Sequence, residues 1–134
     1  MNPRELARQI SIGRMAFGVA FMLAPAWAGR LWIGPDASRP GTKLFIRALG
    51  ARDFALGLGT MLAMRHDRPT RGWLEASGLA DAADAVVTVM AGGSIPPAAR
   101  AAVPPFAAGS AALCGLTAAR VDLGREQVKH ASQA

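Results

Sequence analysis

The stretch RGWLEASGLADAADAVVTVMAG, residues 71–92, decides how this chain folds. Four of its polar side chains recur at i, i+4, i+7 and i+11, at Ser77, Asp81, Asp84 and Thr88. On a helix this spacing confines them to one narrow stripe, because residues three or four apart share a face. The other faces are apolar, whereas a surface helix of a soluble protein has a broad polar face. The stretch therefore predicts a helix in an apolar environment that turns its charges inward.

Three further apolar segments have the length of helices, and Gly, Pro and charged residues separate them. We expect helices at about 6–31, 42–64, 71–92 and 98–120, in one domain that spans residues 1–134. A membrane span needs ~20 mostly apolar residues. Only the last segment reaches that length without a charge, from Ala101 to Ala119. The predicted fold is all-α, a four-helix transmembrane bundle.

The composition agrees with close helix packing in lipid. Hydrophobic residues make up 51% of the 134 residues and charged residues 18%, with many small Ala and Gly side chains. The net charge of +6 does not indicate nucleic acid, because the basic residues form no stripe interleaved with aromatic rings. A single cysteine, Cys114, excludes an internal disulfide, and His66 and His130 stand far apart. No metal site and no cofactor is predicted.

The basic residues near the predicted helix ends are distributed unevenly. Eight fall on one side, Arg4, Arg8, Arg65, Arg68, Arg71, Arg120, Arg125 and Lys129, and four on the other, Arg30, Arg39, Lys43 and Arg100. Cytoplasmic loops carry the excess of Lys and Arg, so both termini are predicted to be cytoplasmic. Trp27, Trp32 and Trp73 fall at predicted helix ends, where indole rings favour the headgroup region. These patterns predict a multi-pass protein of the inner membrane, with the lipid bilayer as its partner.

Two alternatives to this topology stay open. A soluble helical bundle would also contain four apolar helices, although its surface faces would be more polar. The N-terminal segment also has features of a cleaved signal peptide, with Arg4 and Arg8 before an apolar run and the A-x-A sequence at Ala26 to Ala28. Pro25, Trp27 and the long basic region argue against cleavage.

Charges inside the apolar segments indicate a buried network, because ionisable groups in a bilayer normally face inward and pair. In the second segment Asp53 shares a face with Gly50 and Gly57, and Arg52 points about 100° away from it. We therefore expect Arg52 and Asp53 to pair with other helices rather than with each other. Three arginines would balance three aspartates, and Ser110, Cys114 and Thr117 form a weakly polar face on the last segment. The candidate site residues are Arg14, Arg47, Arg52, Asp53, Ser77, Asp81, Asp84 and Thr88.

The run from Arg47 to Asp53 has the form R-x-x-G-x-R-D, with Leu56-Gly57 and Ala80 to Asp84 further on. These residues resemble uncharacterised small four-helix membrane proteins of GC-rich bacteria, which are distantly similar to DoxX-like proteins. The resemblance spans roughly Arg14 to Arg120. The resemblance implies a four-helix membrane fold and a location in the bacterial inner membrane. It does not imply any reaction.

Two functional hypotheses follow. In the first, the chain is an accessory or interaction protein whose buried Arg/Asp network only locks its helices, with a second copy or another membrane protein as its partner. In the second, the network binds or conducts a small polar ligand, a lipid headgroup or a proton. An enzyme is less expected: Asp53, Asp81 and Asp84 would supply acid and base, but no histidine, nucleophile or metal-ligand set accompanies them.

Overall fold

The computed structural model describes the backbone of residues 2–131 and the side chains of residues 2–121. Within this range every regular element is helical, so the prediction of an all-α fold is confirmed. The α-helices are α1 (Pro3–Leu23), α2 (Pro25–Ile33), α3 (Pro40–Arg65), α4 (Arg71–Ala91) and α5 (Pro97–Ala131). Two short 3-10 helices, η1 (Gly34–Ser38) and η2 (Gly92–Ser94), lead into α3 and α5.

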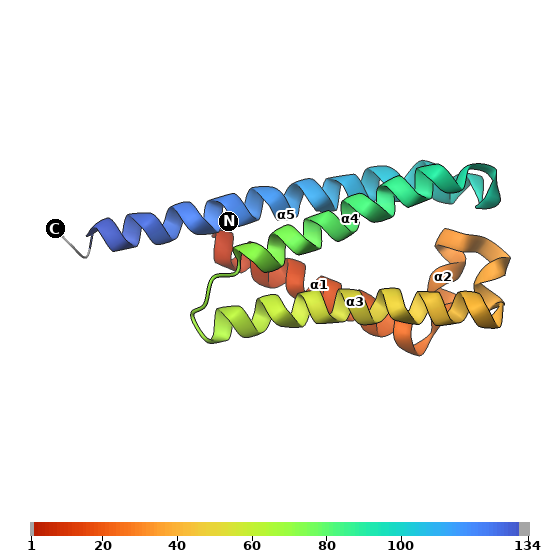
Figure 1. The fold of residues 1–134 in the computed structure, drawn as a ribbon, viewed down its shortest axis with the longest axis horizontal. Coiled ribbons are helices and arrows are strands. Elements are labelled where there is room, and N and C mark those ends of the chain that lie inside the picture. Colours follow the sequence, from red (N-terminus) through yellow and green to blue (C-terminus); the bar gives the residue numbers. More distant parts are fainter. Residues whose placement is uncertain (1, 132–134) are drawn as a thin grey trace.

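The long helices form two antiparallel pairs, α1 with α3 and α4 with α5 (Figure 1). The pairs lie against each other as two layers, in which α3 meets α4 and α1 meets α5 less extensively than the partners within a pair. The N-terminus and loop 66–70 lie at one end of the bundle, and η1 and η2 lie at the other. We call these the N-terminal end and the opposite end.

Glycines bring the backbones of α1 and α3 into direct contact. A Cβ added at Gly18 would lie 2.5 Å from the carbonyl oxygen of Gly50, and one added at Gly50 would lie 2.6 Å from that of Gly18. Two turns further, a Cβ at Gly57 would lie 2.7 Å from the carbonyl oxygen of Ser11. The α3 face of Gly50, Asp53 and Gly57 therefore lies directly against α1.

The prediction of one continuous helix over residues 6–31 is wrong. A break at Ala24 separates α1 from the segment Pro25–Ser38, which turns away by 106°. Pro25 causes the break, because proline donates no N–H to the preceding turn and disfavours helical dihedrals in the residue before it. Ala24 accordingly has φ −125° and ψ 56°. The segment Pro25–Ser38 folds back over the start of α3 and packs against Ile46.

The other helices differ less from the predicted ranges. α3 and α4 agree with 42–64 and 71–92 to within two residues at each end. α5 begins one residue before the predicted 98 but continues to Ala131, past the predicted end at 120. Charged residues were expected to end this helix, yet Arg, Glu, Gln and Lys are good helix formers. The side chains of Arg125, Lys129 and His130 lie outside the described ones.

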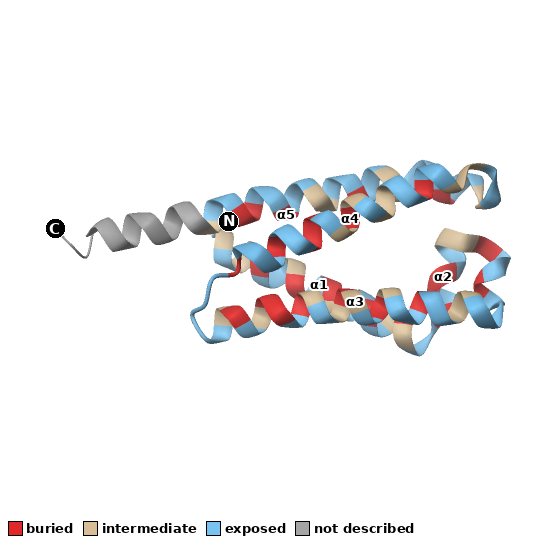
Figure 2. Cartoon of the chain, in the orientation of Figure 1, coloured by how far each residue is buried: buried red, intermediate tan, exposed pale blue. Residues whose placement is uncertain are grey.

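Exposed residues cover much of the outer surface of the bundle (Figure 2), and many of them are large and apolar. Large apolar side chains lie exposed on all five α-helices, whereas the buried hydrophobic residues are mostly alanines. Among the described residues, α5 over Pro97–Val121 is the one helix that alone is long and apolar enough to cross a membrane, with a mean hydropathy of 1.3. α1 and the segment Pro25–Ser38 meet the same criterion only together, as a bent pair.

Candidate functional site

Arg14 lies at the centre of a buried network that joins three helices. Its side chain is 7% exposed, and its Nη1 donates a hydrogen bond of 3.0 Å to Asp53 Oδ1 on α3. Its Nη2 donates to Asp81 Oδ2 and, at 3.4 Å, to the carbonyl oxygen of Ser77, both on α4. The small residues of α1 place its backbone close enough for this reach. Arg14 therefore links the α1–α3 pair to the α4–α5 pair.

Arg52 makes the second link between the pairs. Its Nη1 and Nη2 donate to the two carboxylate oxygens of Asp84 at 3.0 and 2.8 Å, a bidentate arrangement. The expected pairing of Arg52 with another helix is therefore present. The expectation that it would not bond Asp53 is wrong, because its Nε and Nη2 also reach Asp53 Oδ1 at 3.2 and 3.0 Å. The 100° between the two Cβ directions is overcome by the length of the arginine side chain.

Three more side chains complete the network. Ser110 on α5 donates 2.6 Å to Asp81 Oδ2, and Thr88 donates 2.6 Å to the carbonyl oxygen of Asp84. The indole N–H of Trp32 donates 3.0 Å to the Thr88 hydroxyl. Ser110 was visible in the sequence as part of a weakly polar face, but its spacing did not identify a partner. Trp32 was assigned to the headgroup region, and it is half-buried here because α2 folds back toward α4.

Arg47 does not belong to the network. It is exposed, and its Nε donates 3.2 Å to the carbonyl oxygen of Met22. Arg47 and Arg52 are five residues apart and therefore point about 140° apart on the helix, so α3 cannot turn both inward. The predicted balance of three arginines and three aspartates is wrong. Two arginines, Arg14 and Arg52, face three aspartates, Asp53, Asp81 and Asp84.

The network is closed among the described side chains. No buried side-chain nitrogen or oxygen in that part of the chain lacks a hydrogen-bond partner. Its carboxylates are 8 to 19% exposed and its guanidinium groups 7 and 31%. Residues 2–121 contain no group of three His, Cys, Asp or Glu side chains that could hold a metal ion. The arrangement is suited to holding four helices in register.

The network supplies two ion pairs across the boundary between the layers, Arg14–Asp81 and Arg52–Asp84. Removing one partner of a buried pair costs about 3–5 kcal/mol, because the other charge is left without compensation. The layers contact each other less extensively than the helices within each pair do. The two cross-layer ion pairs therefore act together with the apolar cluster of Ala7, Leu74 and Ala118 in docking the layers. Comparison of the chain with protein-family models, with curated proteins and with solved structures finds no match.

Proposed function

We propose that this chain is a multi-pass membrane protein in which α1, α3, α4 and α5 cross the bilayer. The proposal rests on four stretches of helix that have no charged side chains outside the network. Apart from network residues, residues 9–23, 48–64, 76–91 and 101–119 contain no charged side chain. At 1.5 Å per residue these stretches are roughly 22 to 29 Å long. The hydrocarbon core of a bilayer is ~30 Å thick.

The four stretches, whose only charges belong to the network, lie at the same height in the bundle. At the N-terminal end, Ala7, Leu74 and Ala118 form one buried cluster, and Met64 packs against it. These residues mark one boundary of all four stretches. The exposed apolar side chains between the boundaries form a belt, and they are Ile12, Phe17, Val19, Leu58, Leu62, Leu79, Val86, Val87, Val89, Phe106, Leu113 and Leu116. Soluble monomers rarely expose large contiguous apolar patches, so exposed apolar side chains on every long helix favour contact with lipid.

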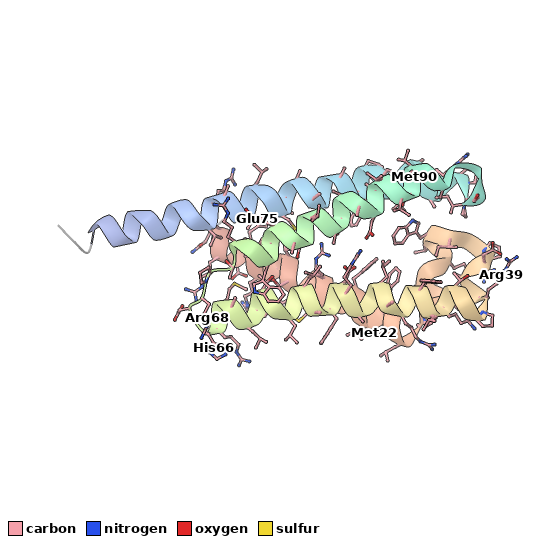
Figure 3. The ribbon with its side chains drawn as sticks, in the orientation of Figure 1. Met22, Arg39, His66, Arg68, Glu75 and Met90 are labelled. Carbon is pink, nitrogen blue, oxygen red and sulfur yellow. The ribbon has the colours of Figure 1, made fainter. Side chains whose placement is uncertain are left out.

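The charged side chains outside the network gather beyond the two ends of this belt (Figure 3). Arg68, His66 and Glu75 lie at the N-terminal end, and Arg39 lies at the opposite end. Glu75 pairs with Arg71 at 2.6 Å, as suits an interfacial residue outside the polar stripe. Charge at both ends and an apolar belt between them is the surface that a bilayer requires.

Mean hydropathy underestimates how apolar the outer surfaces of α1, α3 and α4 are. It averages the charged residues that face the bundle interior with the apolar residues that would face lipid. Asp81 and Asp84 on α4 have side chains that are 12% and 19% exposed, so they face the bundle rather than lipid. α5 has no such charges and meets the criterion alone. The core helix of a soluble protein can also meet it, but only 22% of the apolar part of α5 is buried.

The biochemical role that the site supports best is that of an accessory or interaction protein, whose Arg/Asp network locks its fold. The support is the closed set of hydrogen bonds, which leaves no buried side-chain nitrogen or oxygen of the described residues without a partner. The partner would be a second copy of the chain or another membrane protein. The resemblance to four-helix bacterial proteins favours the inner membrane as its location.

A second role is favoured by the unequal number of charges in the network. Two guanidinium groups and three carboxylates leave a formal charge of −1 when all are ionised. An uncompensated charge inside a membrane is costly, so a proton or a small cation would be attracted to it. The alternative function is therefore binding or conduction of a proton or small polar ligand.

Replacing Asp81 and Asp84 together by Asn separates the two roles. If the network only stabilises the fold, the double variant should melt at a lower temperature in detergent, because both cross-layer ion pairs are lost. This role also predicts that wild-type protein in liposomes filled with a pH-sensitive dye passes no protons under an imposed gradient. Glu75→Gln is the matched control, since it removes an exposed carboxylate from the same helix.

Two outcomes would contradict the proposal that the network has only a structural role. One is an unchanged melting temperature in the Asp81→Asn, Asp84→Asn variant. The other is proton flux through the wild type that this variant abolishes and Glu75→Gln preserves, and it would establish the conducting role.

A further inference from the structure

A pocket of about 400 Å³ opens at the N-terminal end between α1 and α3. α1 contributes Arg4, Glu5 and Arg8 to its lining, and α3 contributes Met61, Met64 and Arg65. Asp67, in the loop after α3, completes it. Three guanidinium groups and two carboxylates give the lining a formal charge of +1, above two methionine side chains. Such a lining suits an anion that carries an apolar group.

Two of these arginines have hydrogen-bond donors to spare. Arg4 is occupied, because its Nη2 donates to Asp67 Oδ1 and to the carbonyl oxygen of Met64, both at 3.0 Å. Arg8 forms an ion pair with Glu5, but the 3.7 Å from its Nη1 to Glu5 Oε2 is too long for a hydrogen bond. The other oxygen of Glu5, Oε1, accepts a hydrogen bond of 2.8 Å from Gln9.

Arg65, across the pocket from α1, makes no ion pair with any side chain that the structure describes. Arg65 and Arg8 are both exposed. An anion in the pocket would therefore meet unoccupied guanidinium donors from both helices of the pair.

The faces that carry these arginines become apolar toward the middle of the bundle. On α1, Ile12 follows Arg8 by four residues and is 40% exposed. On α3, Leu62 and Leu58 precede Arg65 by three and seven residues and are 42% and 37% exposed. The pocket therefore opens toward the apolar belt along two adjacent helix faces.

We propose that this pocket binds the headgroup of an anionic glycerophospholipid. The phosphate accepts hydrogen bonds from Arg8 and Arg65, and the acyl chains lie along Ile12, Leu58 and Leu62. Charge complementarity and the polar-to-apolar order of the lining select a lipid over a soluble anion, and basic pockets between membrane helices are known to take such headgroups. The inference rests on the proposed membrane insertion of the chain.

The test compares lipid retention by three proteins in nanodiscs made of equal parts phosphatidylglycerol and phosphatidylcholine. They are the wild type, the variant Arg8→Gln with Arg65→Gln, and the control Arg30→Gln with Arg100→Gln. The control removes two arginines that are also exposed, from the opposite end. Native mass spectrometry after transfer to detergent reports the lipid that each protein retains.

We expect the wild type and the control to retain phosphatidylglycerol, and the Arg8, Arg65 variant to lose its preference by roughly tenfold. All three should melt alike, since these arginines lie outside the buried network. Equal retention of phosphatidylglycerol in all three would overturn the inference. So would displacement of the lipid by glycerol 3-phosphate at millimolar concentration, which would identify a site for a soluble phosphate.

Carbonate extraction of membranes that contain the same proteins keeps this result separate from the proposed function. Inserted proteins with equal lipid retention would refute only the lipid site. A wild type that carbonate releases would refute the membrane insertion on which the lipid site depends.

Discussion

Arg14 connects the two layers because one guanidinium group meets a carboxylate from each. Asp53 belongs to the same pair of helices as Arg14, and Asp81 belongs to the other pair. A guanidinium group has five N–H donors in a fixed planar arrangement, so it can serve both carboxylates and the carbonyl of Ser77 at once. No other side chain type offers this combination at a single position.

Replacing Arg14 by Gln should lower the free energy of unfolding by about 3–5 kcal/mol, because Asp81 and Asp53 lose a buried partner. Arg47→Gln is the matched control: it removes an exposed arginine that donates a hydrogen bond to the backbone carbonyl of Met22, and it should change stability by less than about 1 kcal/mol. Thermal unfolding of the two variants in the same detergent measures the difference. Equal melting temperatures would show that the network does not hold the layers together.

At the level of single residues, the sequence predicted the polar stripe of α4 but not all of its partners. Ser77, Asp81, Asp84 and Thr88 share one face, so their inward direction followed from helical periodicity alone. The partners depend on how far neighbouring helices approach and on how each arginine bends. Periodicity within one helix contains no information on either, which is why Arg47 was included and Trp32 was placed at the membrane surface.

Among the elements, the contact between α1 and α3 depends on the absence of side chains. Gly18→Ala should separate these helices and destabilise the protein, since its Cβ would lie 2.5 Å from the Gly50 carbonyl oxygen. Gly13→Ala on the same helix is the control, because a Cβ there meets nothing within 4 Å. Alanine is the better helix former by about 1 kcal/mol, so Gly13→Ala should be neutral or stabilising.

Melting temperatures of the two alanine variants check this contrast. If Gly18→Ala is as stable as Gly13→Ala, the helices do not approach through these glycines. The close contact was foreseeable from Gly50 and Gly57 flanking Asp53 on one face of α3. Its partner on α1 was not, because several helices carried small residues.

The direction of the chain after α1 could not be predicted from the sequence pattern either. Pro25 was visible in the sequence, but proline in a membrane helix is also compatible with a kinked span. The direction of the segment Pro25–Ser38 is determined by packing against Ile46 and by the bond from Trp32 to Thr88. Both are tertiary contacts, which local sequence does not encode.

For the whole molecule, the surface consists of the apolar belt and a charged region at each end of the bundle. Arg47 is exposed near the opposite end, so the distribution of Lys and Arg becomes eight to five rather than eight to four. The excess still lies with the N-terminal end. We therefore propose that the N-terminus and loop 66–70 lie on the cytoplasmic side, and η1 and η2 on the other side of the membrane.

The most direct test of the four-helix membrane topology is labelling of single cysteines in spheroplasts with a membrane-impermeant maleimide. Cys114 is buried and is first replaced by Ser, and His66→Cys, Arg39→Cys and Ser94→Cys are then introduced one at a time at exposed positions. The proposed topology predicts that Arg39→Cys and Ser94→Cys react in intact spheroplasts, and that His66→Cys reacts only after lysis. Equal reaction of all three in intact spheroplasts, or recovery of the chain in the soluble fraction without detergent, would contradict it.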